Sequence, residues 1–66
     1  STKIKSLLES DGERVVDLHI WSVGAGKIAA IVSLESAVLK GAQYYHQKLD
    51  CDFDFSHLVI EETKKP

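Results

Sequence analysis

The sequence predicts an α+β domain, a two-layer αββαβ sandwich with two helices on one face of a three-stranded sheet. Residues 15–35 have the pattern of two strands joined at a pair of glycines. Apolar residues recur at helical spacing before and after this hairpin, and residues 57–62 alternate between apolar and polar. Sixty-six residues are enough for one small domain, so residues 1–66 are expected to form a single unit.

The first helix is predicted over Thr2 to Ser10. Ile4, Leu7 and Leu8 stand at three- and four-residue intervals, which places them on one helix face. Asp11 and Gly12 follow, and this pair is typical of a helix end. We therefore expect a short amphipathic helix ahead of the hairpin.

The hairpin has two faces of different chemistry, because successive strand residues point to opposite sides. A three-residue loop of Gly24, Ala25 and Gly26, with Val23 opposite Lys27, places the apolar sets of the two strands on one face. The residues expected on that face are Val16, Leu18, Ile20, Ile28, Ala30, Val32 and Leu34. The residues expected on the other face are Val15, Asp17, His19, Trp21, Val23, Ala29, Ile31 and Ser33. This register pairs Trp21 with Ala29, His19 with Ile31 and Asp17 with Ser33.

A second helix and a third strand complete the pattern. The positions that recur at three- and four-residue intervals and predict the helix are Val38, Leu39, Ala42, Tyr45 and Leu49. Residues 50–56 have the composition of a loop, and residues 57–62 alternate as a strand with Leu58 and Ile60 on one side. Two helices covering one face of the sheet leave the other face open.

Composition excludes several classes of partner. The net charge of −2, with eight scattered Lys and Arg residues, gives no basic surface for nucleic acid or for an anionic membrane. Cys51 is the single cysteine, so no internal disulfide forms, which fits a reducing compartment. No apolar run approaches the ~20 residues that span a bilayer, so we expect no direct membrane insertion of this segment.

Two histidines are the candidate metal ligands. His19 and His57 belong to the face turned away from the helices, and Asp17 and Glu61 are carboxylates on the same face. Neutral imidazole is a good ligand for Zn, Co or Ni ions, and a nearby carboxylate completes or orients such a site. The alternative is that His19 hydrogen-bonds across a dimer interface while His57 lies at a strand end, with no metal.

A second group of possible ligands follows the second helix. Its members are His46, Asp50, Cys51 and Asp52. A solvated helix end, where the helix dipole favours a protonated imidazole, explains these residues as well as a metal does. No CxxC or HxxxH arrangement is present to favour the metal.

The open face also predicts a dimer. Trp21, Val23, Ile31 and Val59 form an apolar patch that a monomer would expose. Tryptophan is typical of interface anchors. We therefore expect a homodimer that buries these four residues.

No enzyme chemistry is predicted. The Gly24 to Lys27 segment lacks the GKS or GKT ending of a phosphate-binding loop and is followed by a strand, so it is interpreted as a turn. The serines have no histidine and acid at a spacing that suggests a triad.

The run DLHIWSVGAGKIAAIVSLE, with HLVIEE near the end, resembles the cytoplasmic C-terminal domain of cation diffusion facilitator metal transporters. The segment VGAGKIAAIVS resembles the cobalt-efflux-like branch more than the zinc-transporting branch, which usually has a histidine where this chain has Ser33. The resemblance covers Ile4 to Glu62 and implies a ferredoxin- or metallochaperone-like sandwich.

The resemblance implies a dimerising, metal-sensing domain on the cytoplasmic side of the inner membrane, attached to a transmembrane part that exchanges a divalent cation for protons. In zinc-transporting relatives the position of His19 supplies a ligand, together with the histidine replaced here by Ser33. We therefore expect weak binding of Co, Zn or Ni by Asp17, His19 and His57. Two alternatives stay open: a free-standing small metal- or ligand-binding module, and a purely structural dimerisation domain without metal.

Overall fold

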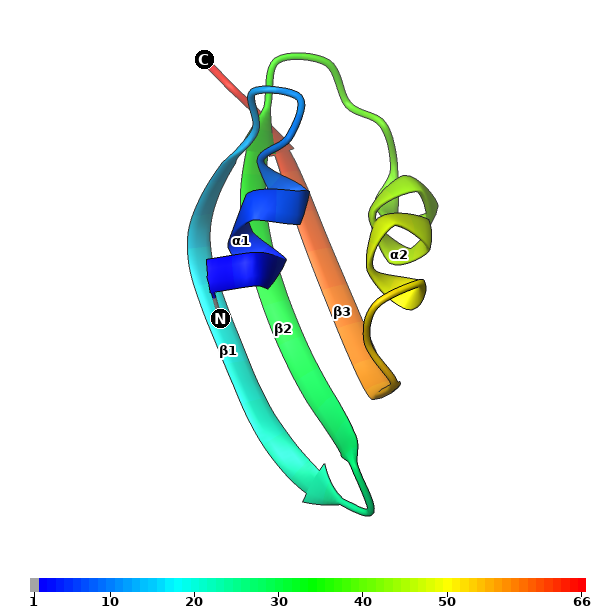
Figure 1. Ribbon diagram of the computed structural model, residues 1–66. Helices are drawn as coiled ribbons and strands as arrows, with labels where there is room; N and C mark the ends of the chain where they lie inside the picture. Colours follow the sequence, from blue (N-terminus) through cyan, green and yellow to red (C-terminus); the bar gives the residue numbers. More distant parts are fainter. Residues whose placement is uncertain (1) are drawn as a thin grey trace.

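The computed structural model describes residues 2–66 and confirms the predicted order of elements. The elements are α1 (Thr2–Leu8), β1 (Arg14–Gly24), β2 (Lys27–Ser36), α2 (Ala42–Asp50) and β3 (Phe55–Lys64). The two helices lie on the same side of one sheet, α1 near β1 and α2 near β3 (Figure 1). The fold is the two-layer αββαβ sandwich that the sequence predicts.

The sheet is mixed, with the spatial order β1-β2-β3. β1 and β2 are antiparallel and joined by a tight turn, whereas β2 and β3 are parallel and joined through α2. A parallel pair needs such a crossover, because the chain must return to the starting end of the sheet. β2 is therefore the central strand.

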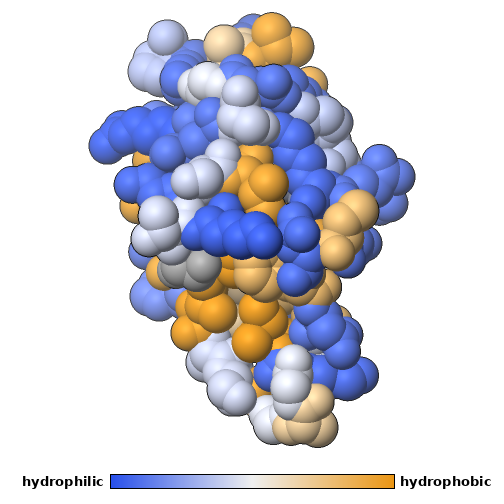
Figure 2. All heavy atoms as spheres, in the orientation of Figure 1, coloured by the Kyte–Doolittle hydropathy of each residue, from blue (hydrophilic) through white to orange (hydrophobic). Residues whose placement is uncertain are grey.

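The core lies between the helices and the sheet. Its buried cluster consists of Ile4, Leu8, Val32, Leu34, Tyr45 and Leu49. α1, β2 and α2 each contribute two of these residues, so the predicted helical and strand patterns meet in one core. Figure 2 shows polar surface over the upper part of the helix side and apolar surface below α1, toward the hairpin end, which the helices do not cover.

The hairpin register agrees with the prediction at its centre and differs at the turn. Trp21 pairs with Ala29, His19 with Ile31 and Asp17 with Ser33, as predicted. The expected pairing of Val23 with Lys27 is wrong, because Gly24 is opposite Lys27 across an irregularity that follows Ser22. The loop is a two-residue turn in which Ala25 and Gly26 both have positive φ, 54° and 75°. Such a turn matches the right-handed twist of the strands.

A β-bulge near the start of β1 overturns the predicted faces of two valines. Val15 is opposite Leu34 and packs against the core, whereas the prediction placed it on the other face. Val16 is the extra residue of the bulge and is 47% exposed, although it was expected in the core. An inserted residue reverses the alternation on one side of the bulge, and a strict period of two cannot detect it.

The second helix begins later than predicted. α2 starts at Ala42, after Gly41, whose φ of 90° is incompatible with a helix. Val38 and Leu39 lie in the preceding loop and are 70% and 56% exposed, so their expected place on the helix face is wrong. The other bounds differ modestly: α1 ends at Leu8, and β3 extends beyond 57–62 at both ends.

Candidate functional site

The face of the sheet opposite the helices carries the predicted site residues. We call it the open face and define it by Asp17, His19, Trp21, Ala29, Ile31, Ser33, His57, Val59 and Glu61. We include Val23, the unpaired residue of β1 near the turn, because it follows the open-face end of the strand two residues after Trp21. Leu58 and Ile60 pack against the core, so the odd-numbered residues between 57 and 61 point to the open face. Nine paired residues from three strands therefore share one surface.

The register arranges nine of these residues in three rows across the strands. One row is Asp17, Ser33 and Glu61; the middle row is His19, Ile31 and Val59; and the third is Trp21, Ala29 and His57. The acidic side chains therefore lie at one end of the open face. His57 lies at the opposite end, and the middle row is largely apolar.

The apolar members of the open face are substantially exposed. Trp21 is 44% exposed, Val23 48%, Ile31 42% and Val59 39%. Ala29, between Trp21 and His57, is buried. A domain of this size rarely leaves large apolar side chains in one contiguous area without a partner. The structure thus brings together the four residues predicted for a dimer interface.

Asp17 and His19 also come together. They are two residues apart on β1, so their side chains project on the same side, and His19 Nε2 lies 3.1 Å from Asp17 Oδ2. Both side chains are exposed. A carboxylate that holds one imidazole nitrogen leaves the other nitrogen available to a ligand, as in carboxylate–histidine–metal arrangements.

His57 does not join this pair within one protomer. It lies on β3 in the row of Trp21, and β2 separates it from β1. Neighbouring strands are about 4.8 Å apart, so side chains on β1 and β3 are separated by roughly 10 Å before any offset along the strands. Among residues 2–66, no three His, Cys, Asp or Glu side chains gather closely enough to hold a metal ion.

Ser33 occupies the centre of the acidic row. Its hydroxyl lies 3.5 Å from Glu61 Oε1, and Asp17 is its partner on the other side. Ser33 therefore lies between two carboxylates. Its hydroxyl is a weaker metal ligand than either of them. A side chain at position 33 that binds metal more strongly would make all three members of this row metal ligands.

The second group of possible ligands stays dispersed. Cys51 and Asp52 are exposed at the end of α2, and Asp52 Oδ1 lies 3.6 Å from Lys3 Nζ. His46 lies in the middle of α2, and no cluster of three ligands includes it among the residues that the structure describes. This arrangement fits a solvated helix end.

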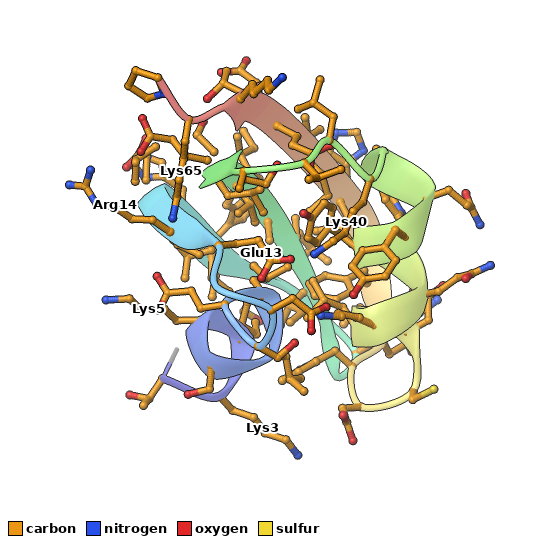
Figure 3. All side chains as sticks on the ribbon, turned by 90° about the horizontal axis from the view of Figure 1, so that it is seen from above. Lys3, Lys5, Glu13, Arg14, Lys40 and Lys65 are labelled. Atoms are coloured by element: carbon orange, nitrogen blue, oxygen red, sulfur yellow. The ribbon has the colours of Figure 1, made fainter. Side chains whose placement is uncertain are left out.

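A polar network beside the core was not predicted from the sequence. Glu62 accepts hydrogen bonds from the Ser36 hydroxyl at 2.6 Å and from the backbone N–H groups of Lys40 and Gly41 at 3.0 and 2.9 Å. Tyr45 Oη lies 3.0 Å from Glu62 and 3.2 Å from Glu13, and the Lys40 ammonium donates to Glu13 at 3.0 Å. Figure 3 shows Glu13 and Lys40 directed toward each other beside α2.

This network shifts the titration of its members. Partial burial opposes ionisation of Glu62, but the hydrogen bonds from Ser36, from the backbone of Lys40 and Gly41, and from Tyr45 outweigh it and hold the pKa of Glu62 at about 2. Burial and the neighbouring carboxylates raise the pKa of Tyr45. Glu62 thus anchors the segment that leads into α2, because it accepts from the backbone N–H groups of Lys40 and of Gly41, the residue that precedes the helix.

A sequence signal for Glu62 does exist. Its even number places it on the same face as Leu58 and Ile60, so the alternation of β3 directs this carboxylate toward the core. A charged residue at a core-facing position needs hydrogen-bond partners. Tyr45 and Ser36, both polar and both buried, are those partners.

The comparisons with known proteins give no family. No protein-family model matches the chain, no curated protein is similar to it, and no solved structure matches it. Within residues 2–66, none of the helices has the length and apolar character needed to cross a membrane.

Proposed function

We propose that this chain is the dimerisation and metal-sensing domain of a divalent transition-metal efflux transporter, located on the cytoplasmic side of the membrane. The αββαβ sandwich and the sequence resemblance to the cation diffusion facilitator domains support this proposal. The observation that carries it is the open face, where four exposed apolar residues accompany the Asp17 and His19 pair.

The open face explains how metal and dimer would be linked. One protomer brings Asp17 and His19 together, and residues 2–66 place no third ligand near them. A second open face packed against the first would add ligands from the partner, His57 among them. A metal held between protomers favours one arrangement of the dimer only by the difference in its affinity for the two arrangements.

The proposal is tested by calorimetric titration of the domain with Zn and Co ions. His19→Ala is expected to remove most of the binding, because it deletes the imidazole beside Asp17. His46→Ala, in the middle of α2, is the matched control and is expected to bind as the wild type does. Protons compete for imidazole, so affinity should be lower at pH ~5.5 than at pH ~7.5, on either side of the usual histidine pKa.

Ser33→His is the complementary test. The new side chain would lie between Asp17 and Glu61 in the acidic row and next to the row of His19. We expect tighter binding of Zn and Co than in the wild type, by roughly tenfold or more for one added imidazole ligand. Unchanged binding by Ser33→His, or undiminished binding by His19→Ala, would contradict a metal site on the open face.

A second candidate function is a structural dimerisation domain that binds no metal. The observation in its favour is that the described residues of one protomer hold no group of three ligands. It predicts a dimer with no heat of binding for either ion, whether or not Ser33 is replaced.

A further inference from the structure

The rows of the open face restrict how two copies can pack. A two-fold axis that relates two sheets packed face to face lies between them. When the strands of the two sheets are roughly aligned, this axis runs either along the strands or across them. In both cases an axis over the middle row brings Ile31 near the partner's Ile31. The two arrangements differ in which charged side chains they superpose.

An axis along the strands places like charges together. It sets β1 over the partner's β3 with the rows unchanged, so Asp17 lies over the partner's Glu61 and the same contact occurs twice. Four carboxylates would then share one edge of the interface. Like charges brought together at an interface strongly disfavour association.

An axis across the strands reverses the rows and pairs complementary groups. Glu61 then lies over the partner's His57, and Asp17 lies over the partner's Trp21. An imidazole can donate a hydrogen bond to a carboxylate, and the indole N–H of a buried tryptophan needs an acceptor. Asp17, Glu61 and His57 thus acquire partners of suitable chemistry at the ends of the open face, as does the indole of Trp21.

We propose that two copies of this chain pack open face to open face, with antiparallel strands, about an axis that runs across the strands, along the row of His19, Ile31 and Val59. His57 of each copy contacts the partner's Glu61. This inference rests on the proposed dimerisation and adds its orientation. It describes the dimer without metal, because it directs the partner's His57 to Glu61 on β3 and away from Asp17 and His19 on β1.

The test is a charge-exchange cycle read by sedimentation equilibrium. His57→Glu and Glu61→Lys are made singly and together, with far-UV circular dichroism as the check on folding. In the His57→Glu variant, the new carboxylate lies opposite the partner's Glu61. We expect this repulsion to raise the dimer Kd about tenfold or more. The double variant exchanges the two charges and is expected to return the Kd to near the wild-type value.

The matched control places comparable substitutions on another element. His46→Glu and Asp50→Lys change an imidazole and a carboxylate that are also four residues apart, but on α2, away from the open face. These variants are expected to leave the dimer Kd unchanged. An effect as large as that of His57→Glu would overturn the placement of the contact.

The outcomes separate the orientation from the proposed function. A wild-type chain that stays monomeric contradicts the dimer itself. A wild-type dimer that Glu61→Lys tightens supports the axis along the strands, because the lysine would lie over the partner's Asp17, and it overturns our orientation alone. A double variant no better than His57→Glu overturns it as well.

Discussion

Both faces of the sheet carry large apolar residues, but those on the helix side are buried or partly buried and those on the open face are exposed. On the helix side, Leu34 and Tyr45 are fully buried, and the Tyr45 hydroxyl has carboxylate partners. On the open face, Trp21 and Ile31 remain close to half exposed, and the nearby Asp17 and His19 side chains contact each other. The covered face therefore stabilises the protomer, while the open face is available for a partner. The predictions below separate these two roles.

The largest expected effect is on the covered face. Tyr45→Ala removes a fully buried ring and should lower the free energy of unfolding by about 3 to 5 kcal/mol. Because the contact lies within one protomer, the loss should not depend on protein concentration. Urea unfolding at two concentrations measures it, and Tyr45→Phe is the control that keeps the ring. A strongly concentration-dependent loss would show that Tyr45 contributes to association.

The corresponding change on the open face should depend on concentration. Trp21→Ala removes a side chain that is 44% exposed in the protomer. We expect a small loss when the protein is dilute and monomeric, and weakening of the dimer by about 2 kcal/mol or more, as for an interface anchor. The same urea experiment at two concentrations measures both. An equal loss at both concentrations would place Trp21 among the residues that stabilise the protomer alone.

Acid should lower the free energy of unfolding by protonating Glu62, which lies on the covered face. The pKa of Glu62 is about 2 in the folded protein and near 4.5 when the group is unperturbed. Its contribution to stability is therefore complete above pH about 4.5 and is lost as the pH falls toward 2. Glu62→Gln should lower stability at neutral pH by about 1 to 2 kcal/mol and flatten this part of the pH profile. Thermal unfolding between these pH values checks it, with Glu61→Gln as the open-face control. A profile as steep as that of the wild type would contradict the role of Glu62.

The smallest expected effects are in the hairpin turn. Ala25 adopts a φ of 54°, a left-handed conformation that costs an alanine ~1 kcal/mol, so Ala25→Asn should stabilise the domain by a few tenths of a kcal/mol to 1 kcal/mol. Gly26→Ala should destabilise it by about 1 kcal/mol, because the glycine has a φ of 75°. Melting temperatures of the two variants measure this. If Ala25→Asn melted lower than the wild type, the assignment of the turn would be wrong.

The sequence predicted the elements and the centre of the hairpin because their signals are local. Strict alternation placed Asp17, His19 and Trp21 on one face, and the register of the structure agrees. Helical spacing likewise identified Ile4, Leu8 and Leu49 as core residues.

What the sequence did not predict depends on contacts between distant segments or on single backbone irregularities. The bulge at Val16 reverses the face of Val15, and no composition signal marks it. Val38 and Leu39 continue the helical spacing of α2, but Gly41 prevents the helix from including them. The separation of His57 from His19 follows from the strand order, since β2 lies between β1 and β3.

The most direct test of the account is whether the open face forms the homodimer. Sedimentation velocity of the wild type is compared with Ile31→Asp, at the centre of the open face, and with Val38→Asp, the same kind of substitution at an exposed position in the loop before α2. We predict a dimer for the wild type and for Val38→Asp, and a folded monomer for Ile31→Asp, because a buried unpaired carboxylate strongly opposes association. A wild type that remains monomeric at high micromolar concentration, or an Ile31→Asp variant that dimerises as the wild type does, would contradict the account.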